Sequence, residues 1–185
     1  MSLRILAGRL RGRVLATPEG VGALRPTSAR RREAVFDILR AQLGDLEGIT
    51  LADLFAGTGA VGLEALSLGA ARVVFVENDP KAARLIRRNL DTLGVADRAR
   101  VLQNDASRLT PAAERVDAVF LDPPYGRGLA ERALARLHDG GWLAEDAVVL
   151  VELGKGDTFT TPAGYALARE HPHGAGRLVR LEPAG

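Results

Sequence analysis

The sequence contains no cysteine, and this absence excludes disulfide bonds, thiolate metal sites and cysteine nucleophiles. It also agrees with a reducing compartment, so we expect a cytoplasmic protein. The three histidines, His138, His171 and His173, are not spaced like a metal-binding set. We therefore expect no metal site.

Long apolar runs are lacking too. No stretch is long enough to cross a bilayer, and the N-terminus lacks the charged-then-apolar order of a signal peptide, so we expect no membrane contact. The 185 residues, 46% of them hydrophobic, suffice for one domain with a full core. Without an internal repeat or a long linker, the sequence predicts a single domain over 1–185. Separately, we expect a monomer. A basic extension over 1–46 would precede a core over 47–185.

Lysine is nearly absent, and the positive charge is carried by arginine. The first forty residues hold nine arginines against three acidic residues, a formal charge of +6, which leaves −4 for the remainder of a chain whose net charge is +2. The planar guanidinium fork suits phosphate oxygens better than the point charge of lysine does. This distribution favours a polyanionic partner, and a solvated arginine-rich surface is the alternative.

All of these arginines except Arg25 fall in two predicted elements. From Leu3 to Leu15, arginines at every second position predict a strand with three of them on one face. A helix follows that Thr27 or Ser28 can cap, with an apolar stripe at Val35, Ile38, Leu39 and Leu43.

The first turn of this helix is unusual. Arg30, Arg31 and Arg32 place positive charge where the helix dipole disfavours it, and such a conflict favours phosphate contact. We predict that the following residues bind RNA: Arg9, Arg11, Arg13, Arg25, Arg30 and Arg31.

From Thr50 onward, apolar strand patterns alternate with helical patterns. The alternation predicts an α/β fold, a mostly parallel sheet with helices on both faces. The predicted segments are Leu51 to Phe55, Val61 to Leu68, Val73 to Val76, Pro80 to Leu93, Arg100 to Gln103, Val116 to Leu121, Leu129 to Leu137 and Ala147 to Val151. Two further strands, Tyr165 to Ala168 and Arg177 to Leu181, are joined by so short a connection, His171 to Gly176, that they must form an antiparallel hairpin.

The first strand–turn–helix unit carries a nucleotide-binding pattern. Glycines at positions 57, 59 and 62 satisfy G-x-G-x-x-G, and Glu77 ends the next strand where a carboxylate meets ribose hydroxyls. Asp105 follows the third strand and could accept from an adenine amino group. Helix capping and solvent exposure are the alternative for both acids. The predicted cofactor contacts are Asp53, Phe55, Ala56, Gly57, Thr58, Gly59, Glu77, Asn78, Asn104, Asp105 and Ala106.

Two cofactors compete for this site. A nicotinamide dinucleotide brings a pyrophosphate, and Asp53 would place a negative charge near it. S-adenosylmethionine instead has an ammonium group and a sulfonium, which an acidic site attracts. The pattern therefore favours S-adenosylmethionine.

The tetrapeptide Asp122-Pro123-Pro124-Tyr125 follows an apolar strand directly. Two prolines end the strand and stiffen the loop, because proline has no N–H for the sheet and fixes its own φ. The Asp122 carboxylate and the Pro123 carbonyl would then be two acceptors beside an aromatic face. The amino group of a nucleobase offers the matching two donors and a ring that can stack. We predict these four residues to be catalytic; an ordinary strand-ending turn is the alternative.

These motifs carry a family resemblance. Asp53-Leu-Phe-Ala-Gly-Thr-Gly and Asp122-Pro-Pro-Tyr resemble class I methyltransferases that act on amino groups of bases. The opening Arg4-Ile-Leu-Ala-Gly-Arg-Leu-Arg-Gly-Arg, with Leu24-Arg25-Pro26-Thr27 and Gly62-Leu-Glu-Ala-Leu-Ser-Leu-Gly-Ala, resembles the RsmD family of bacterial 16S rRNA guanine-N2 methyltransferases.

The resemblance implies a Rossmann-like sheet of seven strands with the last strand reversed, and S-adenosylmethionine as methyl donor. It also implies a guanine(966)-type substrate in 16S rRNA, in an assembled or partly assembled 30S subunit. Three alternatives remain open: a DNA adenine or cytosine amino-methyltransferase, a protein-glutamine methyltransferase and a non-catalytic RNA-binding module.

Overall fold

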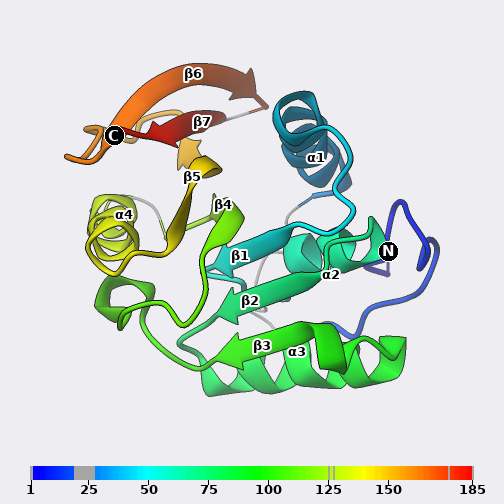
Figure 1. Cartoon of the computed structure of the whole chain (residues 1–185). Coiled ribbons are helices and arrows are strands. Elements are labelled where there is room, and N and C mark those ends of the chain that lie inside the picture. The colour runs from blue at the N-terminus through cyan, green and yellow to red at the C-terminus, as the bar shows by residue number, and fades with distance from the viewer. Residues whose placement is uncertain (1, 19–27, 125, 127, 175, 185) are drawn as a thin grey trace.

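A seven-stranded sheet forms the centre of the computed structural model, which describes residues 2–18, 28–124, 126, 128–174 and 176–184. The strand order is β3-β2-β1-β4-β5-β7-β6. Strands β1 to β5 pair in parallel, whereas β7 runs antiparallel to both β5 and β6. The expected mostly parallel sheet with a reversed last strand is therefore confirmed (Figure 1).

The elements follow the predicted alternation closely. They are α1 (Ala29–Leu43), β1 (Thr50–Leu54), α2 (Ala60–Ser67), β2 (Arg72–Val76), α3 (Pro80–Leu93), η1 (Ala96–Arg98), β3 (Ala99–Leu102), η2 (Ala106–Arg108), β4 (Val116–Leu121), α4 (Leu129–Asp139), β5 (Leu143–Gly154), β6 (Tyr165–His173) and β7 (Gly176–Pro183). The predicted C-terminal hairpin is confirmed, although its strands continue into the expected connection. No helix in these described ranges is both long and apolar enough to span a membrane.

Alternate residues of the strands bury two separate apolar layers, one on each face of the sheet. Helices α1, α2 and α3 pack on one face, where Leu39, Leu66 and Ile86 belong to the same apolar cluster as strand residues such as Phe120. Helix α4 covers the other face through Leu134 and its neighbours. Figure 1 shows α1 and α4 on opposite sides of the sheet. We call the two surfaces the α1 face and the α4 face.

Local sequence signals fix the helix ends. Asp79 caps α3 by accepting from the Lys81 amide, Pro80 follows as the first helical residue, and Gly94 ends the helix with a left-handed backbone. Ser28 caps α1 by accepting from the Arg31 amide. The alternative cap Thr27 lies outside the described residues, as does Arg25.

The prediction of one strand from Leu3 to Leu15 is wrong. The segment folds back on itself, with an isolated antiparallel bridge between Arg4 and Val14. The chain reverses because Gly8 and Gly12 both have a φ of 81°, which glycine adopts without steric cost. We call residues 3–15 the N-terminal arm.

The arginines of the arm consequently do not share one strand face. Arg9 forms a salt bridge of 3.0 Å with Glu47, and Arg13 donates to the carbonyl of Thr92. Arg11 is exposed on the surface.

A buried ion pair attaches the arm to the helices. Glu64 of α2 is 1% exposed and accepts hydrogen bonds from the amides of Leu6 and Ala7 at 2.7 to 3.0 Å. Arg32 of α1, also 1% exposed, approaches Glu64 at 3.9 Å and donates to the carbonyl of Arg4. The expectation that Arg32 meets phosphate is therefore wrong: its charge compensates a buried carboxylate in a contact between segments distant in the sequence.

We predict that Glu64→Ala lowers the free energy of unfolding by about 3–5 kcal/mol, because it leaves the buried Arg32 guanidinium without a compensating negative charge and the amides of Leu6 and Ala7 without an acceptor. Urea denaturation followed by circular dichroism measures the change. As a control, Glu47→Ala removes the acceptor of an exposed pair and should cost no more than about 1 kcal/mol. Equal losses in the two variants would contradict the role given to Glu64.

Candidate functional site

The carboxyl ends of β1, β2, β3, β4 and β5 lie along one edge of the sheet, where open α/β sheets bind their ligands. The loop after β1 is conformationally special. Phe55 has a φ of 58°, the only positive value among non-glycine residues of the described ranges, and Gly57 and Gly59 have φ of 56° and 73°. Such strained backbone is concentrated at functional sites.

Gly62 serves packing. A Cβ there would lie 2.3 Å from the Phe75 ring on β2, so only glycine lets α2 approach the sheet this closely.

Glu77, at the end of β2, holds the glycine loop. It is 7% exposed, and its two carboxylate oxygens accept from the amides of Gly57 at 2.7 Å and Asp79 at 2.8 Å. Asn78, next along the chain, is exposed. Glu77, which we predict to bind the ribose, therefore lies beside the glycine loop, and the two amides fix the orientation of its carboxylate.

Asp53 lies beneath the loop rather than on the surface. It is 2% exposed and accepts from the Gly62 amide at 2.9 Å. Burial raises the pKa of this carboxyl to about 8; the Gly62 amide opposes the shift, while the nearby charges of Asp122 and Glu77 add to it. Thr58, within the loop, is buried as well.

The end of β3 contributes a third group of predicted residues. Asp105 caps the short helix η2, accepting from the amide and hydroxyl of Ser107 at 2.8 Å, and these bonds lower its pKa. The Asn104 side chain accepts from the Asp105 amide, and Ala106 is buried. Asp105 therefore caps a helix, as the alternative interpretation of the sequence predicted, but its carboxylate is still partly accessible.

Asp122 immediately follows β4, as predicted. Strand alternation directs its side chain to the α1 face, because Ala118 and Phe120 lie in the core on that side. Burial raises the pKa of Asp122, and the positive charge of Arg31 opposes the shift. Pro123 is buried and Pro124 exposed, whereas Tyr125 and Arg127 lie outside the described residues.

One acidic residue of the site is absent from the sequence-based prediction. Glu152, near the end of β5, is 1% exposed and forms a salt bridge of 3.1 Å with the Nε of Arg31. The pair explains part of the unusual arginine triplet, since Arg31 faces a buried carboxylate. Arg30 is exposed.

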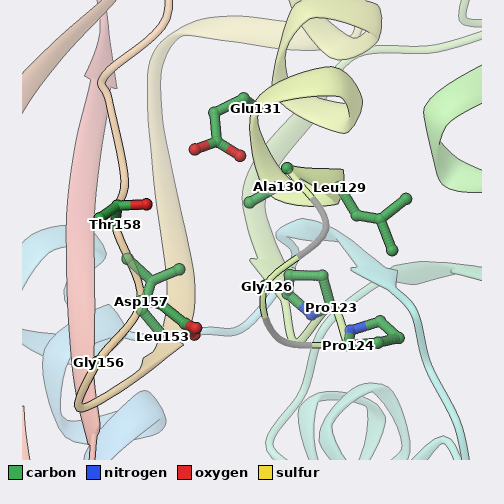
Figure 2. Close-up of a pocket in the computed structure, with 11 residues that line it drawn as sticks. Pro123, Pro124, Gly126, Leu129, Ala130, Glu131, Leu153, Gly156, Asp157 and Thr158 are labelled. Carbon is green, nitrogen blue, oxygen red and sulfur yellow. The ribbon is translucent and has the colours of Figure 1, made fainter.

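A cavity of about 220 Å³ adjoins the Pro123–Pro124 turn on the α4 face (Figure 2). Its opposite wall is the turn after β5, which includes Asp157 and Thr158. Asp157 fixes that turn by accepting from the Gly154 amide at 2.7 Å, and Arg177 donates to the carbonyls of both residues. Pro123 and Pro124 therefore line one wall of a preformed hollow.

The site suits a ligand that carries positive charge. Asp122 and Glu77 are close enough to Asp53 for their charges to raise its pKa. The backbone at Gly57 is accessible, since a Cβ there would meet only the Phe55 carbonyl, at 3.9 Å. No group of three or more His, Asp or Glu side chains that could hold a metal ion occurs in the described ranges.

The chain is similar to known proteins over nearly its whole length. The family model described as "Conserved hypothetical protein 95" matches residues 3–181. The ribosomal RNA small subunit methyltransferase D of Escherichia coli K12 is 39% identical over 99% of this chain and 92% of its own, and that of Haemophilus influenzae is 36% identical over 93% and 89%. The solved structure of the E. coli protein yhhF superposes with a TM-score of 0.84 at 38% identity, covering 99% of this chain and 98% of that one.

We predict that Asp53→Asn reduces the pH dependence of stability. Between the ordinary carboxyl pKa of 3.8 and the folded value of about 8, the folded protein holds a proton that the unfolded chain has lost. Unfolding free energy therefore falls as pH rises through this window, and asparagine, which can still accept from Gly62, removes that contribution.

The variant should be more stable than the wild type at pH 8 by more than about 1 kcal/mol and nearly equal to it at pH 4. Urea denaturation across this range measures both. Parallel stability curves would show that Asp53 does not titrate there.

Proposed function

This chain belongs to the family of the ribosomal RNA small subunit methyltransferases D, and on that premise we propose that it methylates the N2 amino group of a guanine in 16S rRNA. The methyl donor would be S-adenosylmethionine, and the substrate a guanine(966)-type position in an assembled or partly assembled 30S subunit. The observation that carries the proposal is the position of Asp122 and Pro123 beside the acidic site at the ends of β1 and β2.

The residues present fit the methyl donor. Glu77, oriented by two amides, has lone pairs left for ribose hydroxyls, and Asp105 remains accessible to an adenine amino group. The carboxyl groups of Asp53 and Asp122 can ionise beside a bound cation, so they complement an ammonium group and a sulfonium. Bound there, S-adenosylmethionine supplies an electrophilic methyl group. The flanking residues Phe55, Ala56, Thr58, Gly59, Asn78, Asn104 and Ala106 complete the proposed contacts.

Asp122 and the Pro123 carbonyl act on the substrate amine. Each accepts one of its two hydrogens, which turns the nitrogen lone pair out of conjugation and toward the methyl carbon. A C–N bond forms as the C–S bond breaks, and the proton that the amine loses passes to Asp122 or to water. Burial raises the pKa of Asp122 and makes it a better proton acceptor.

Positioning supplies most of the rate, since holding two reactants in near-attack geometry can remove roughly 7–11 kcal/mol of barrier. The guanine must leave its stack to reach the site, and Tyr125 is proposed to stack on it.

The basic N-terminus is proposed to bind the phosphate backbone. Arg9, Arg11, Arg13 and Arg30 are exposed, so phosphate oxygens can reach them. Arg31 is partly exposed beside Glu152, and its charge acts on Asp122. Arg25 completes the proposed set. Incubation with labelled S-adenosylmethionine and either rRNA, 30S particles, DNA or protein tests the substrate class, and transfer only to DNA or protein would refute it.

We predict that Asp122→Ala lowers methyl transfer by at least roughly 100-fold, because the amine loses an acceptor and a proton-accepting group. Affinity for S-adenosylmethionine should stay near the wild-type value. Labelled methyl transfer and calorimetric titration measure the two quantities. Asp146→Ala, at an exposed position of β5, is the control and should leave both unchanged. Undiminished turnover of Asp122→Ala would refute the role.

We predict that replacing Arg9, Arg11 and Arg13 together by alanine weakens RNA binding and flattens its salt dependence, because every neutralised phosphate contributes just under one unit to the slope. Filter binding between about 50 and 200 mM salt measures this. The matched control replaces three exposed arginines outside the N-terminal region, Arg100, Arg115 and Arg136. An equal effect in both variants would show that the arm has no special role.

A further inference from the structure

Glu152 is the immediate neighbour of Asp122 across the sheet. Strands β4 and β5 pair in parallel with Leu121 opposite Val151, so the next pair in this register is Asp122 and Glu152, about 4.8 Å apart in backbone spacing. Both side chains project to the α1 face, since Phe120 and Leu150 precede them there in the core. Any base held by Asp122 is therefore within reach of Glu152.

The carboxylate of Glu152 is only half satisfied. Its Oε1 pairs with Arg31 at 3.1 Å, while its Oε2 is buried and has no hydrogen-bond partner among the described residues. Glu64, the other buried glutamate of comparable exposure, differs: both its oxygens accept from backbone amides. Both carboxylate oxygens of Glu64 are used by the fold, whereas Glu152 keeps one unused acceptor close to Asp122.

The surroundings of Glu152 place its titration near neutrality. Burial raises the pKa of this carboxyl to about 7, Arg31 of α1 opposes the shift, and the negative charge of Asp122 on β4 adds to it. Across the sheet on β7, the residue in register is the apolar Leu178. A group of this kind changes from proton donor to proton acceptor within the range in which the enzyme can be assayed.

We infer that Glu152 selects guanine, with its free Oε2 accepting the N1–H of the base while Asp122 and Pro123 hold the adjacent N2 amino group. This inference rests on the function proposed above. N1 of guanine is a hydrogen-bond donor, whereas N1 of adenine and N3 of cytosine are acceptors that an ionised carboxylate repels. Arg31 holds Oε1 and so turns Oε2 toward the base.

The purine analogue 2-aminopurine tests this directly, because it keeps the N2 amino group but carries an acceptor at N1. Small-subunit particles are reconstituted with guanine or 2-aminopurine at the methylated position, and labelled methyl transfer is measured. Glu152→Gln should lower transfer to guanine roughly 10- to 100-fold, because a charged acceptor is lost. In this variant Arg31 pairs with the amide oxygen of the glutamine, so the side-chain NH₂ takes the place of Oε2. This NH₂ can donate to N1 of 2-aminopurine, and transfer to that base should therefore increase.

The wild-type enzyme gives a second readout that needs no variant. Transfer to guanine should rise as pH increases through about 7, since ionised Glu152 accepts from N1–H. Transfer to 2-aminopurine should fall over the same range, since only protonated Glu152 donates to its N1. A purely structural Arg31–Glu152 pair would give the same pH profile with both bases.

The control is Glu145→Gln, the same chemical change at an exposed position of β5, which should leave the preference between the two bases unchanged. Affinity for S-adenosylmethionine and thermal melting verify that Glu152→Gln is folded. An unaltered guanine to 2-aminopurine ratio in Glu152→Gln, or identical pH profiles in the wild type, would overturn the inference while the proposed function stands. Absence of transfer to guanine particles by the wild type would overturn both.

Discussion

The parallel register of β1, β4 and β5 is the constraint on which the site depends. It brings Asp53, Asp122 and Glu152 to the carboxyl ends of three adjacent strands, on the same face of the sheet. Burial raises the pKa of all three carboxyls, and Arg31 is the cation that opposes this for Asp122 and Glu152. Desolvated acids in such proximity favour cationic ligands and hydrogen-bond donors, and these are the two things that a methyl donor and a base amine provide.

The arginine-rich start of α1 has two roles that are distinct in space. Arg32 compensates Glu64 and holds the N-terminal arm, while Arg31 compensates Glu152 at the site. Arg30 is directed to solvent, where RNA can reach it. A charge pattern that is unfavourable for an isolated helix is thus stabilised by acidic partners on α2 and β5.

Much of the fold could be predicted because its signals are local. The bounds of α3 and β4 match the prediction residue for residue. The signals for both are adjacent in the sequence: the cap Asp79 precedes Pro80 at the start of α3, and two prolines follow closely after β4. The arm was mispredicted because two glycines outweigh the alternation of its arginines. The partner of Arg32 could not be read from sequence, because it comes from another helix. Glu152 could have been found, because, like Asp122, it is an acidic residue directly after an apolar run in the sequence.

The two ion pairs of α1 also determine where that helix can sit. Consecutive helical residues rise by about 1.5 Å and point about 100° apart, so anchors at Arg31 and Arg32 prevent both sliding along the helix axis and rotation about it. The first turn of helix α1 is thereby fixed between the N-terminal arm and β5. An insertion between Arg31 and Arg32 would put one of the two guanidinium groups out of phase, whereas length changes ahead of Ser28 leave this alignment intact.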